Sequence, residues 1–472
     1  MNDGASVPRP SADLLDALRS IVGQGGIITG GDVALRDPGV FMKRIEADAV
    51  VRPRTTDEVS RIMAACNAAG QTLVVHGGMS GWVRGTQTDG GEIVLSLERM
   101  NAILDVDVVN RTATVEAGVI LEALQTALEA FDLAFPLDLG GRGSCQLGGN
   151  AATNAGGMRV LRYGMMREQV LGIEVVLADG RIVSSMNRMM KNNTGYDLKQ
   201  LFIGSEGTLG VITGLVLRLR ERPTSTNTAL VGARTFGQIA KLLRFMDSKL
   251  GGLLSAFELV DNSFYAVNTG SGRHGAPLAP DWPFYAMIET LGSDQTRDTE
   301  LFEQVLAEAA EQGLFDDSVL PRSERERLAI WEIREDLEHI VREFQPFHAF
   351  DVSLPVGDME AYMATVATQL KAIWPEGRIA FLGHVGDGNL HVAIGAGDAH
   401  DRHRVEACVY EPLGQYGGSI SAEHGIGLEK KPWLAISRNA QERGLMIELK
   451  NLLDPNGILN PGKIFDLPAG AG

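Results

Sequence analysis

The feature that most limits how this chain can fold is a glycine-rich stretch near its C-terminus, His384-Val385-Gly386-Asp387-Gly388-Asn389-Leu390-His391. On one straight strand His384 and His391 would point to opposite faces, because side chains alternate with a period of two. A helix is costly here because Gly383, Gly386 and Gly388 lie in or beside the stretch. The glycines therefore predict a tight loop or bulge that turns both imidazoles toward one point.

A carboxylate follows further along the chain, in Ser421-Ala422-Glu423-His424-Gly425-Ile426-Gly427. Two imidazoles and a carboxylate, here His384, His391 and Glu423, are the usual three-ligand set of a catalytic zinc or similar divalent ion that keeps a position open for substrate. The alternative is that they are ordinary loop residues, which is the commoner case for any single histidine.

Length and composition limit the class of protein. The 472 residues exceed what one hydrophobic core supports, so we expect two or three domains. The formal net charge of −17 argues against nucleic acid and against an anionic membrane surface. Three widely spaced cysteines, Cys66, Cys145 and Cys408, predict a reducing compartment and no disulfide framework.

The N-terminal stretch from Met1 to Pro10 has no basic region followed by an apolar core. No apolar run approaches the length of about 18 residues that a membrane helix needs. We therefore expect no signal peptide, no integral membrane segment and a cytoplasmic location.

The first part of the chain alternates helix and strand signals. The pattern predicts helices over 11–22 and 56–69, the second capped by Thr56 or Asp57, and strands over 49–51, 72–75, 93–96 and 113–117. Further strands are expected over 170–178, ending in a turn at Asp179-Gly180, and over 210–219. The apolar pattern breaks near 220–226, which predicts a boundary, and a long charged helix is predicted from Ser323 to Glu343.

Two glycine-rich stretches in the first third of the chain are candidate phosphate-binding loops. One is His76-Gly77-Gly78-Met79-Ser80-Gly81, directly after a strand, and the other runs from Gly140 to Asn150. Neither is a G-x-G-x-x-G followed by a helix, nor a P-loop. Both can present consecutive backbone N–H groups to a pyrophosphate. The alternative is that they are only tight turns.

Several motifs resemble known flavoproteins. The stretches that resemble the flavin-binding domain of the vanillyl-alcohol oxidase superfamily are 135–139, 148–157, 161–164, 193–198 and 202–210. The motifs at 384–391 and 421–427, closed by Asn460-Pro461-Gly462-Lys463, are similar to its FAD-dependent D-2-hydroxyacid dehydrogenase branch. Within that branch the flavin half most resembles the D-2-hydroxyglutarate dehydrogenases.

This resemblance implies an α+β fold in three parts. Residues 1–222 would form a two-lobed FAD-binding domain of the vanillyl-alcohol oxidase type. Residues 223–422 would form a substrate and metal-binding domain with an antiparallel sheet flanked by helices, and 423–472 a segment that returns to the FAD domain. The residues expected to contact the cofactor are Gly77, Gly78, Met79, Ser80, Gly81, Pro136, Gly148, Gly149, Asn150, Thr153, Asn154, Ser205, Glu206, Gly207, Gly210, Ile212 and Asn460.

The resemblance also implies that FAD is bound non-covalently. Covalent members of the superfamily carry a histidine where this chain has Ser80. Some relatives use a cysteine as a second tether, and Cys145 lies in a flavin-facing loop. We expect a packing role for Cys145 instead.

The implied reaction is oxidation of a small D-2-hydroxy acid. A divalent metal held by His384, His391 and Glu423 would bind the substrate hydroxyl and lower its pKa. We expect zinc, with manganese, cobalt or iron as alternatives. His424 is the expected base, because it lies next to Glu423 and can address another side of the substrate.

Two further residues are expected to bind the substrate carboxylate. Asn389 could donate to it, and Arg334 could pair with it through a bidentate fork. The alternative for Arg334 is a solvated helix face, paired with Glu338 one turn on.

The substrate side chain is predicted from two positions at which this chain differs from the D-2-hydroxyglutarate dehydrogenases. D-2-hydroxyglutarate dehydrogenases carry a threonine and a lysine that meet the distal carboxylate, and the matching positions here are Glu338 and Ala349. A second carboxylate on the substrate would have no lysine to pair with at position 349 and would meet the negative charge of Glu338. We therefore expect an uncharged side chain, from lactate to larger apolar acids. D-2-hydroxyglutarate is the alternative, with Arg342 or His348 in place of the lysine.

Partners and competing functions stay open at this point. An electron-transfer flavoprotein, a quinone or a cytochrome are all candidate acceptors, and an oxygen-using oxidase would share these motifs. A metal-dependent hydrolase leaves the glycine loops unexplained, and a non-enzymatic flavin module would need none of the metal ligands. A homodimer is the assembly we expect.

Overall fold

The computed structural model describes residues 9–39, 44–270, 273–398 and 400–467. The chain forms two compact units. Unit 1 contains residues 1–155, 165–222 and 424–472, and unit 2 contains 156–164 and 223–423. The predicted absence of a signal peptide concerns residues that lie almost wholly outside the described ranges. Among the described helices, none is both long and apolar enough to cross a bilayer.

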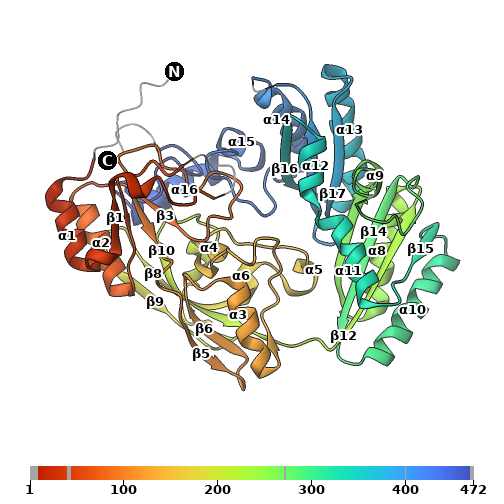
Figure 1. Cartoon of the computed structure of the whole chain (residues 1–472), viewed down its shortest axis with the longest axis horizontal. Helices are drawn as coiled ribbons and strands as arrows, with labels where there is room; N and C mark the ends of the chain where they lie inside the picture. The colour runs from red at the N-terminus through yellow and green to blue at the C-terminus, as the bar shows by residue number, and fades with distance from the viewer. Residues whose placement is uncertain (1–8, 40–43, 271–272, 399, 468–472) are drawn as a thin grey trace. The chain divides into compact units, whose positions relative to one another are not determined.

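The first lobe of unit 1 is a four-stranded sheet with helices packed against it (Figure 1). Its strand order is β1 (Ile27–Thr29), β2 (Ala49–Val51), β4 (Ile93–Ser96) and β3 (Leu73–His76), with β4 parallel to both neighbours. The two predicted helices are α1 (Ala12–Val22) and α2 (Thr56–Ala68). Thr55, not Thr56 or Asp57, caps α2, because its side chain accepts from Glu58 N at 3.1 Å.

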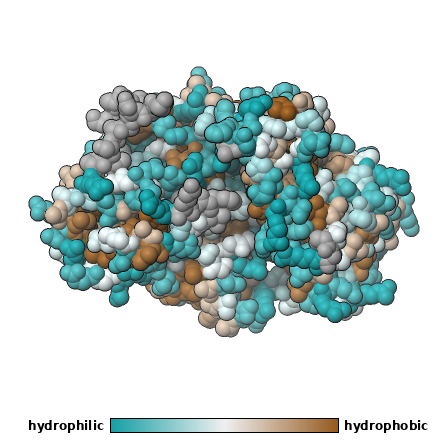
Figure 2. Space-filling model, turned by 45° about the horizontal axis from the view of Figure 1, so that its top comes forward, coloured by the Kyte–Doolittle hydropathy of each residue, from teal (hydrophilic) through white to brown (hydrophobic). Residues whose placement is uncertain are grey.

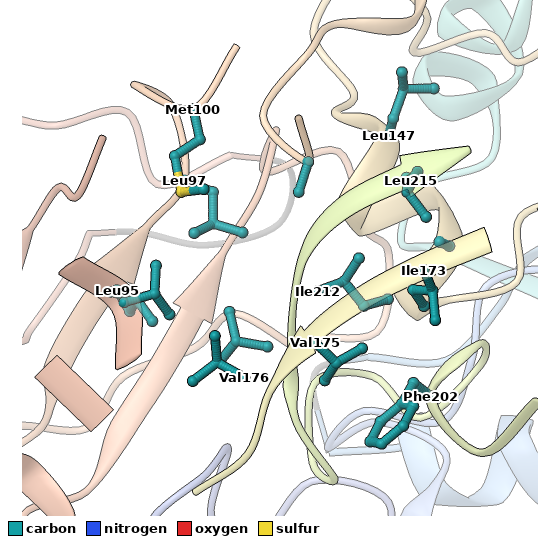
Figure 3. Packing of buried hydrophobic residues seen from close by; sticks show 14 of the residues in the cluster. Leu95, Leu97, Met100, Leu147, Ile173, Val175, Val176, Phe202, Ile212 and Leu215 are labelled. Carbon is teal, nitrogen blue, oxygen red and sulfur yellow. The ribbon is translucent and has the colours of Figure 1, made fainter. Parts of the chain in front are cut away.

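The second lobe of unit 1 is a five-stranded antiparallel sheet. Its strand order is β5 (Ile103–Asp107), β6 (Thr112–Glu116), β10 (Val211–Arg218), β8 (Val170–Val176) and β9 (Ile182–Ser185). The predicted turn at Asp179-Gly180 joins β8 to β9, and Gly180 adopts a φ of 88° there. Ile173, Val175 and Leu215 from this sheet share one buried cluster with Leu95 and Leu97 of the first lobe (Figure 3).

Unit 2 is built on a seven-stranded antiparallel sheet. Its order is β15 (Asp317–Val319), β12 (Ser225–Ala233), β14 (Phe284–Gly292), β13 (Leu254–Asp261), β17 (Arg378–His384), β18 (Asn389–Gly395) and β16 (Phe347–Ser353). α9 (Asn262–Gly270), α11 (Glu324–Glu335) and α12 (Leu337–Glu343) bury apolar residues against one face. α8 (Phe236–Leu250) and α10 (Gln295–Glu311) pack against each other and β12, and α13 (Met359–Ile373) against α14 (Arg402–Tyr410).

The predicted helix from Ser323 to Glu343 is not continuous. It divides at Asp336, which leaves the helical conformation and caps α12 by accepting from His339 N at 3.2 Å. The Asp336 carboxylate also pairs with Arg273 and His274. An aspartate that can cap a new helix competes with continuation of the old one.

The C-terminal residues of unit 1 extend its first sheet. α16 (Ala440–Leu453) leads into residues 458–460, which run parallel to β3 and bond to Leu73 through Ile458 O and Asn460 N. The buried Lys450 ammonium donates to Thr208 O and Leu459 O, both at 2.8 Å, and pairs with the buried Asp454 carboxylate. On the face shown in Figure 2, hydrophobic residues are dispersed among hydrophilic ones.

Replacing Lys450 with Met should cost unit 1 about 3–5 kcal/mol of unfolding free energy, because Asp454 is left as a buried charge without its partner. The Lys249→Met control breaks a pair with Glu308 that is about half exposed, and should cost under about 1 kcal/mol. Urea denaturation followed by circular dichroism measures both. Equal losses of unfolding free energy in the two variants would contradict the role given to Lys450.

Candidate active site

The glycine-rich stretch forms a tight reversal between two neighbouring strands. β17 ends at His384, a single turn of 3₁₀-helix spans Val385–Asp387, and β18 begins at Asn389 after Gly388 with a φ of 85°. Leu382 pairs with His391 in the antiparallel register, so His384 and His391 lie on the same face of the sheet. The backbones approach so closely that a Cβ added at Gly383 would lie 2.4 Å from Asn389 O.

The three residues predicted to bind metal lie together in unit 2. Their ligand atoms are all within 4.8 Å of one another. Glu423 Oε1 lies 3.7 Å from His384 Nε2, and Glu423 Oε2 lies 3.8 Å from His391 Nε2. Two backbone groups fix Glu423: its N–H donates to Asp351 Oδ2 at 3.0 Å, and its carboxylate accepts from Gly157 N at 2.7 Å.

Two fully buried carboxylates lie behind these ligands. His384 Nδ1 donates to Glu258 Oε1 at 2.6 Å, which leaves Nε2 facing Glu423. Asp351 pairs with His391 across β16 and β18, with its Oδ1 at 4.0 Å from His391 Nδ1. A carboxylate hydrogen-bonded as Glu258 is fixes the tautomer and ring orientation of a metal-binding histidine. Asp351 Oδ1 is too far from His391 Nδ1 for a hydrogen bond. Neither carboxylate was predicted from the sequence, although a single glutamate in the apolar run Leu254–Val260 was an available signal.

Arg334 is part of this buried network. It is 7% exposed, and its Nε donates to Glu258 Oε2 at 3.1 Å. The solvated-face alternative is therefore wrong, since Glu338 lies on the next helix and pairs with Arg342 at 2.8 Å. The two terminal nitrogens of Arg334 make no hydrogen bond to any residue that the structure describes.

The charges of the cluster favour a cation. Three carboxylates, Glu258, Asp351 and Glu423, surround one guanidinium, that of Arg334, so at least two negative charges remain when both imidazoles are neutral. A fourth carboxyl, that of Asp387, interacts with His384 and has its pKa raised to about 7 by burial. Burial lowers the pKa of His384, but the charges of Glu258 and Glu423 outweigh it and raise the pKa to about 9. Two imidazole nitrogens, a carboxylate and this excess charge fit a divalent ion.

Asn389 lies on the same face as His391, two residues away on β18. It is 3% exposed, and neither atom of its side-chain amide has a hydrogen-bond partner among the described residues. A buried amide without partners is costly, so Asn389 suits a polar ligand.

The two glycine loops predicted to bind the cofactor pack against each other in unit 1. A Cβ added at Gly78 would lie 2.0 Å from Ser144 O, whereas one added at Gly81 or Gly149 would meet no atom within 4 Å. Gln146, which begins α4 (Leu147–Ala152), has a buried Oε1 without a partner among the described residues. Open space beside exposed backbone and an unpartnered amide fit a large polar cofactor such as FAD.

Several predicted cofactor residues use their side chains to hold the loops. Ser205 Oγ donates to Phe202 O and Thr153 Oγ1 to Gly149 O, at 2.8 and 3.1 Å. Asn460 Oδ1 accepts from Val75 N and its Nδ2 donates to Glu206 O, at 2.8 and 2.6 Å. The side chains of these residues therefore position the backbone of the loops predicted to bind the cofactor.

Three other predicted cofactor residues also serve the packing of unit 1. The side chain of Ile212 is 4% exposed and lies in the core of unit 1 (Figure 3). A Cβ added at Gly210 would lie 2.6 Å from Val175, so Gly210 is required by packing. The Glu206 carboxylate accepts from Ile426 N and Gly427 N, at 2.7 and 2.8 Å, and so anchors the C-terminal segment. Cys145 is 3% exposed, in agreement with a packing role.

His424, the predicted base, follows Glu423 directly but belongs to unit 1. Its ring stacks on that of Trp82, with centroids 5.3 Å apart and planes inclined by 18°. The remaining predicted cofactor residues, Met79, Ser80, Pro136, Asn150, Asn154 and Gly207, also lie in unit 1.

The sequence matches two family models. Residues 47–185 match the "FAD binding domain" and residues 222–464 the "FAD linked oxidases, C-terminal domain". A D-2-hydroxyglutarate dehydrogenase of Danio rerio is 39% identical over 93% of this chain and 83% of its own length. One from Stutzerimonas stutzeri is 36% identical over 96% of this chain and 98% of its own length. A Schizosaccharomyces pombe protein named as a candidate D-lactate dehydrogenase is 38% identical over 95% of this chain and 89% of its own length.

Solved structures confirm the predicted fold class. p-Cresol methylhydroxylase superposes with a TM-score of 0.75 at 14% identity, covering 96% of each chain. Alkyldihydroxyacetonephosphate synthase superposes with a TM-score of 0.74 at 16% identity, covering 98% of this chain and 86% of the other. The fold is of the vanillyl-alcohol oxidase type, with an antiparallel sheet flanked by helices in unit 2.

The predicted cytoplasmic location is overturned by these comparisons. The relatives from Danio rerio, Arabidopsis thaliana and Bos taurus are named as mitochondrial proteins. The bacterial relative from Stutzerimonas stutzeri is named without a location. A short N-terminal sequence pattern was an insufficient basis for that prediction.

In metal-free protein, Glu258→Gln should lower the pKa of His384 from about 9. The substitution removes the negative charge of Glu258, which raises this pKa, whereas burial and the charge of Arg334 still lower it. Nuclear magnetic resonance titration of the imidazole measures this, and Glu338→Gln is the control that should leave the pKa unchanged. The raised pKa stabilises the metal-free fold fully below pH 6.5, and this contribution is lost as the pH rises through about 9. A pKa that stays near 9 in Glu258→Gln would contradict the assignment.

Proposed function

Because the chain belongs to the FAD-linked oxidases, in the branch of the D-2-hydroxyglutarate and D-lactate dehydrogenases, we propose that it oxidises a D-2-hydroxy acid to the 2-oxo acid. It is an FAD-dependent oxidoreductase that acts on a CH–OH group. The observation that carries the proposal is the cluster of His384, His391 and Glu423 beside the unpartnered amide of Asn389.

The chain's own residues divide the chemistry between the two units. Bound FAD supplies the acceptor for the hydride that leaves carbon 2 of the substrate. In unit 1, the loops 77–81 and 148–154 offer backbone N–H groups to the cofactor phosphates. The binding is non-covalent, since Ser80 stands where covalent relatives have a histidine.

His384, His391 and Glu423 would hold a divalent ion, for which zinc is the first candidate and manganese, cobalt and iron are alternatives. Such an ion would lower the pKa of the substrate hydroxyl, as zinc lowers that of bound water from ~16 to ~7. The support is the ligand geometry and the two excess negative charges around it.

His424 takes the hydroxyl proton in this proposal. It follows Glu423 in the chain, so their Cα atoms are within about 3.8 Å whatever the arrangement of the units. The Asn389 amide and the terminal nitrogens of Arg334 are available to the substrate carboxylate, and Glu258 holds Arg334 in place.

We favour a substrate whose side chain is uncharged. Ala349, Leu382 and Ala393 lie next to His391 or Asp351 on this face of the sheet, and none is charged. Glu338 does not contribute to this preference, because it is exposed and paired with Arg342. The names of the relatives favour D-2-hydroxyglutarate as the second candidate. His348 does not replace the missing lysine, because it points to the face opposite Ala349.

The electron acceptor is proposed only by class. An electron-transfer flavoprotein, a quinone or a cytochrome would each accept electrons from FAD, and an oxygen-using oxidase is the alternative. The assembly is proposed to be a homodimer.

Removing the metal with a chelator should abolish turnover and leave the flavin spectrum intact, because the proposed ligands are distinct from the cofactor loops. His391→Ala should have the same effect and should not recover with added metal, since a ligand is missing. Elemental analysis and absorbance near 450 nm separate metal loss from flavin loss. Full activity in metal-free protein would contradict the metal proposal.

His424→Ala should retain flavin and metal but lower kcat on the order of 10²-fold or more, the scale expected for loss of a general base. Steady-state kinetics with an artificial acceptor measure the change. A kcat near the wild-type value with a higher KM would make His424 a binding residue.

D-lactate or a larger apolar D-2-hydroxy acid should give a higher kcat/KM than D-2-hydroxyglutarate. Ala349→Lys should shift the ratio toward D-2-hydroxyglutarate, because it adds a cation on the site face, whereas the control Glu338→Thr should not. A wild-type preference for D-2-hydroxyglutarate of about tenfold, or roughly 1.4 kcal/mol, would reject the uncharged side chain.

A further inference from the structure

The loop after the first glycine stretch carries a tryptophan in contact with the proposed base. Trp82 directly follows Gly81, and its indole is stacked on the His424 imidazole at 5.3 Å between centroids and 18° between planes. Both residues belong to unit 1 and both are half-buried. None of the roles given above to the glycine loop accounts for a large aromatic side chain at this position.

The backbone around His424 is held tightly by the same loop. Val83 O accepts from Leu428 N at 3.0 Å, and Arg84 forms a salt bridge with Glu429. A Cβ added at Gly427 would lie 2.1 Å from Val83 O, so the two segments are in direct contact. The bonds from Glu206 to Ile426 N and Gly427 N fix the other side.

These contacts place the backbone of residue 424, and the stack with Trp82 covers one face of its ring. An imidazole on a fixed backbone still rotates about two side-chain bonds, and a general base must have its nitrogen within hydrogen-bond reach of the proton. A parallel indole restricts that rotation to the plane of the stack, and an aromatic pair of this kind is favourable beyond its buried area.

We propose that Trp82 is a positioning residue for His424, whose ring it holds by covering one face. The proposal rests on the proposed function, in which His424 takes the hydroxyl proton. A flat aromatic surface is the property required at position 82, and apolar bulk alone does not supply it.

The test compares Trp82→Leu with Trp82→Phe in the full-length flavoprotein. Leu keeps apolar bulk without a flat ring, so kcat should fall about tenfold, which corresponds to about 1.4 kcal/mol, with KM little changed. Trp82→Phe should retain most of the wild-type kcat, because it keeps a flat ring. Slower proton removal should also raise the solvent isotope effect on kcat in the Leu variant. Trp374→Leu, which removes a tryptophan stacked on Arg404 in unit 2, is the matched control.

A double-mutant cycle gives the second readout. In a His424→Ala background, Trp82→Leu should produce no further loss of the residual rate, because there is no ring left to position. Thermal unfolding and the ratio of flavin to protein should be equal for the Leu and Phe variants.

Three results would overturn the proposal. They are a kcat in Trp82→Leu equal to that of the wild type, equal losses in the Leu and Phe variants, and additive losses in the double mutant. If no D-2-hydroxy acid bleaches the flavin absorbance of the wild type, the proposed function fails. If wild type and Trp82→Leu bleach at the same rate, only the role of Trp82 fails.

Discussion

The hydrogen bond from His384 Nδ1 to the buried Glu258 carboxylate is the interaction on which the rest of the candidate site depends. It orients the imidazole so that Nε2 faces Glu423, and it gives Arg334 a fixed partner on the other carboxylate oxygen. A buried carboxylate is tolerated only when it is paired and hydrogen-bonded. Glu258 meets that condition with one imidazole and one guanidinium, so the same residue supports a proposed metal ligand and a proposed substrate-binding cation.

The same condition applies to unit 1, where buried polar groups join segments that are far apart in sequence. Asn460 connects the end of β3 to the loop at Glu206, and Glu206 in turn binds the backbone of 426–427. Lys450 fixes the last helix to Thr208. The C-terminal segment that carries His424 is thus tied to the loops proposed to bind FAD by hydrogen bonds and not by apolar packing alone.

The sequence predicts those parts of the molecule that local chemistry determines. Most strands and the reversal between His384 and His391 follow from periodicity and from glycine, whereas the fold class follows from the resemblance to known flavoproteins. Contacts set by distant segments were missed: Glu258 and Asp351 behind the ligands, and Trp82 against His424. Glu338 shows why, because a helix break at Asp336 separates it from Arg334, and Glu338 pairs with Arg342 within its own short helix.

The most direct test of the central claim is anomalous X-ray scattering from crystals of the flavoprotein, recorded above and below the absorption edge of each candidate metal. The account predicts one peak at about 2.0–2.2 Å from His384 Nε2, His391 Nε2 and a Glu423 oxygen, with Glu258 still bonded to Nδ1. The contradicting result is no peak at any edge, together with a hydrogen bond or water between the imidazoles and Glu423.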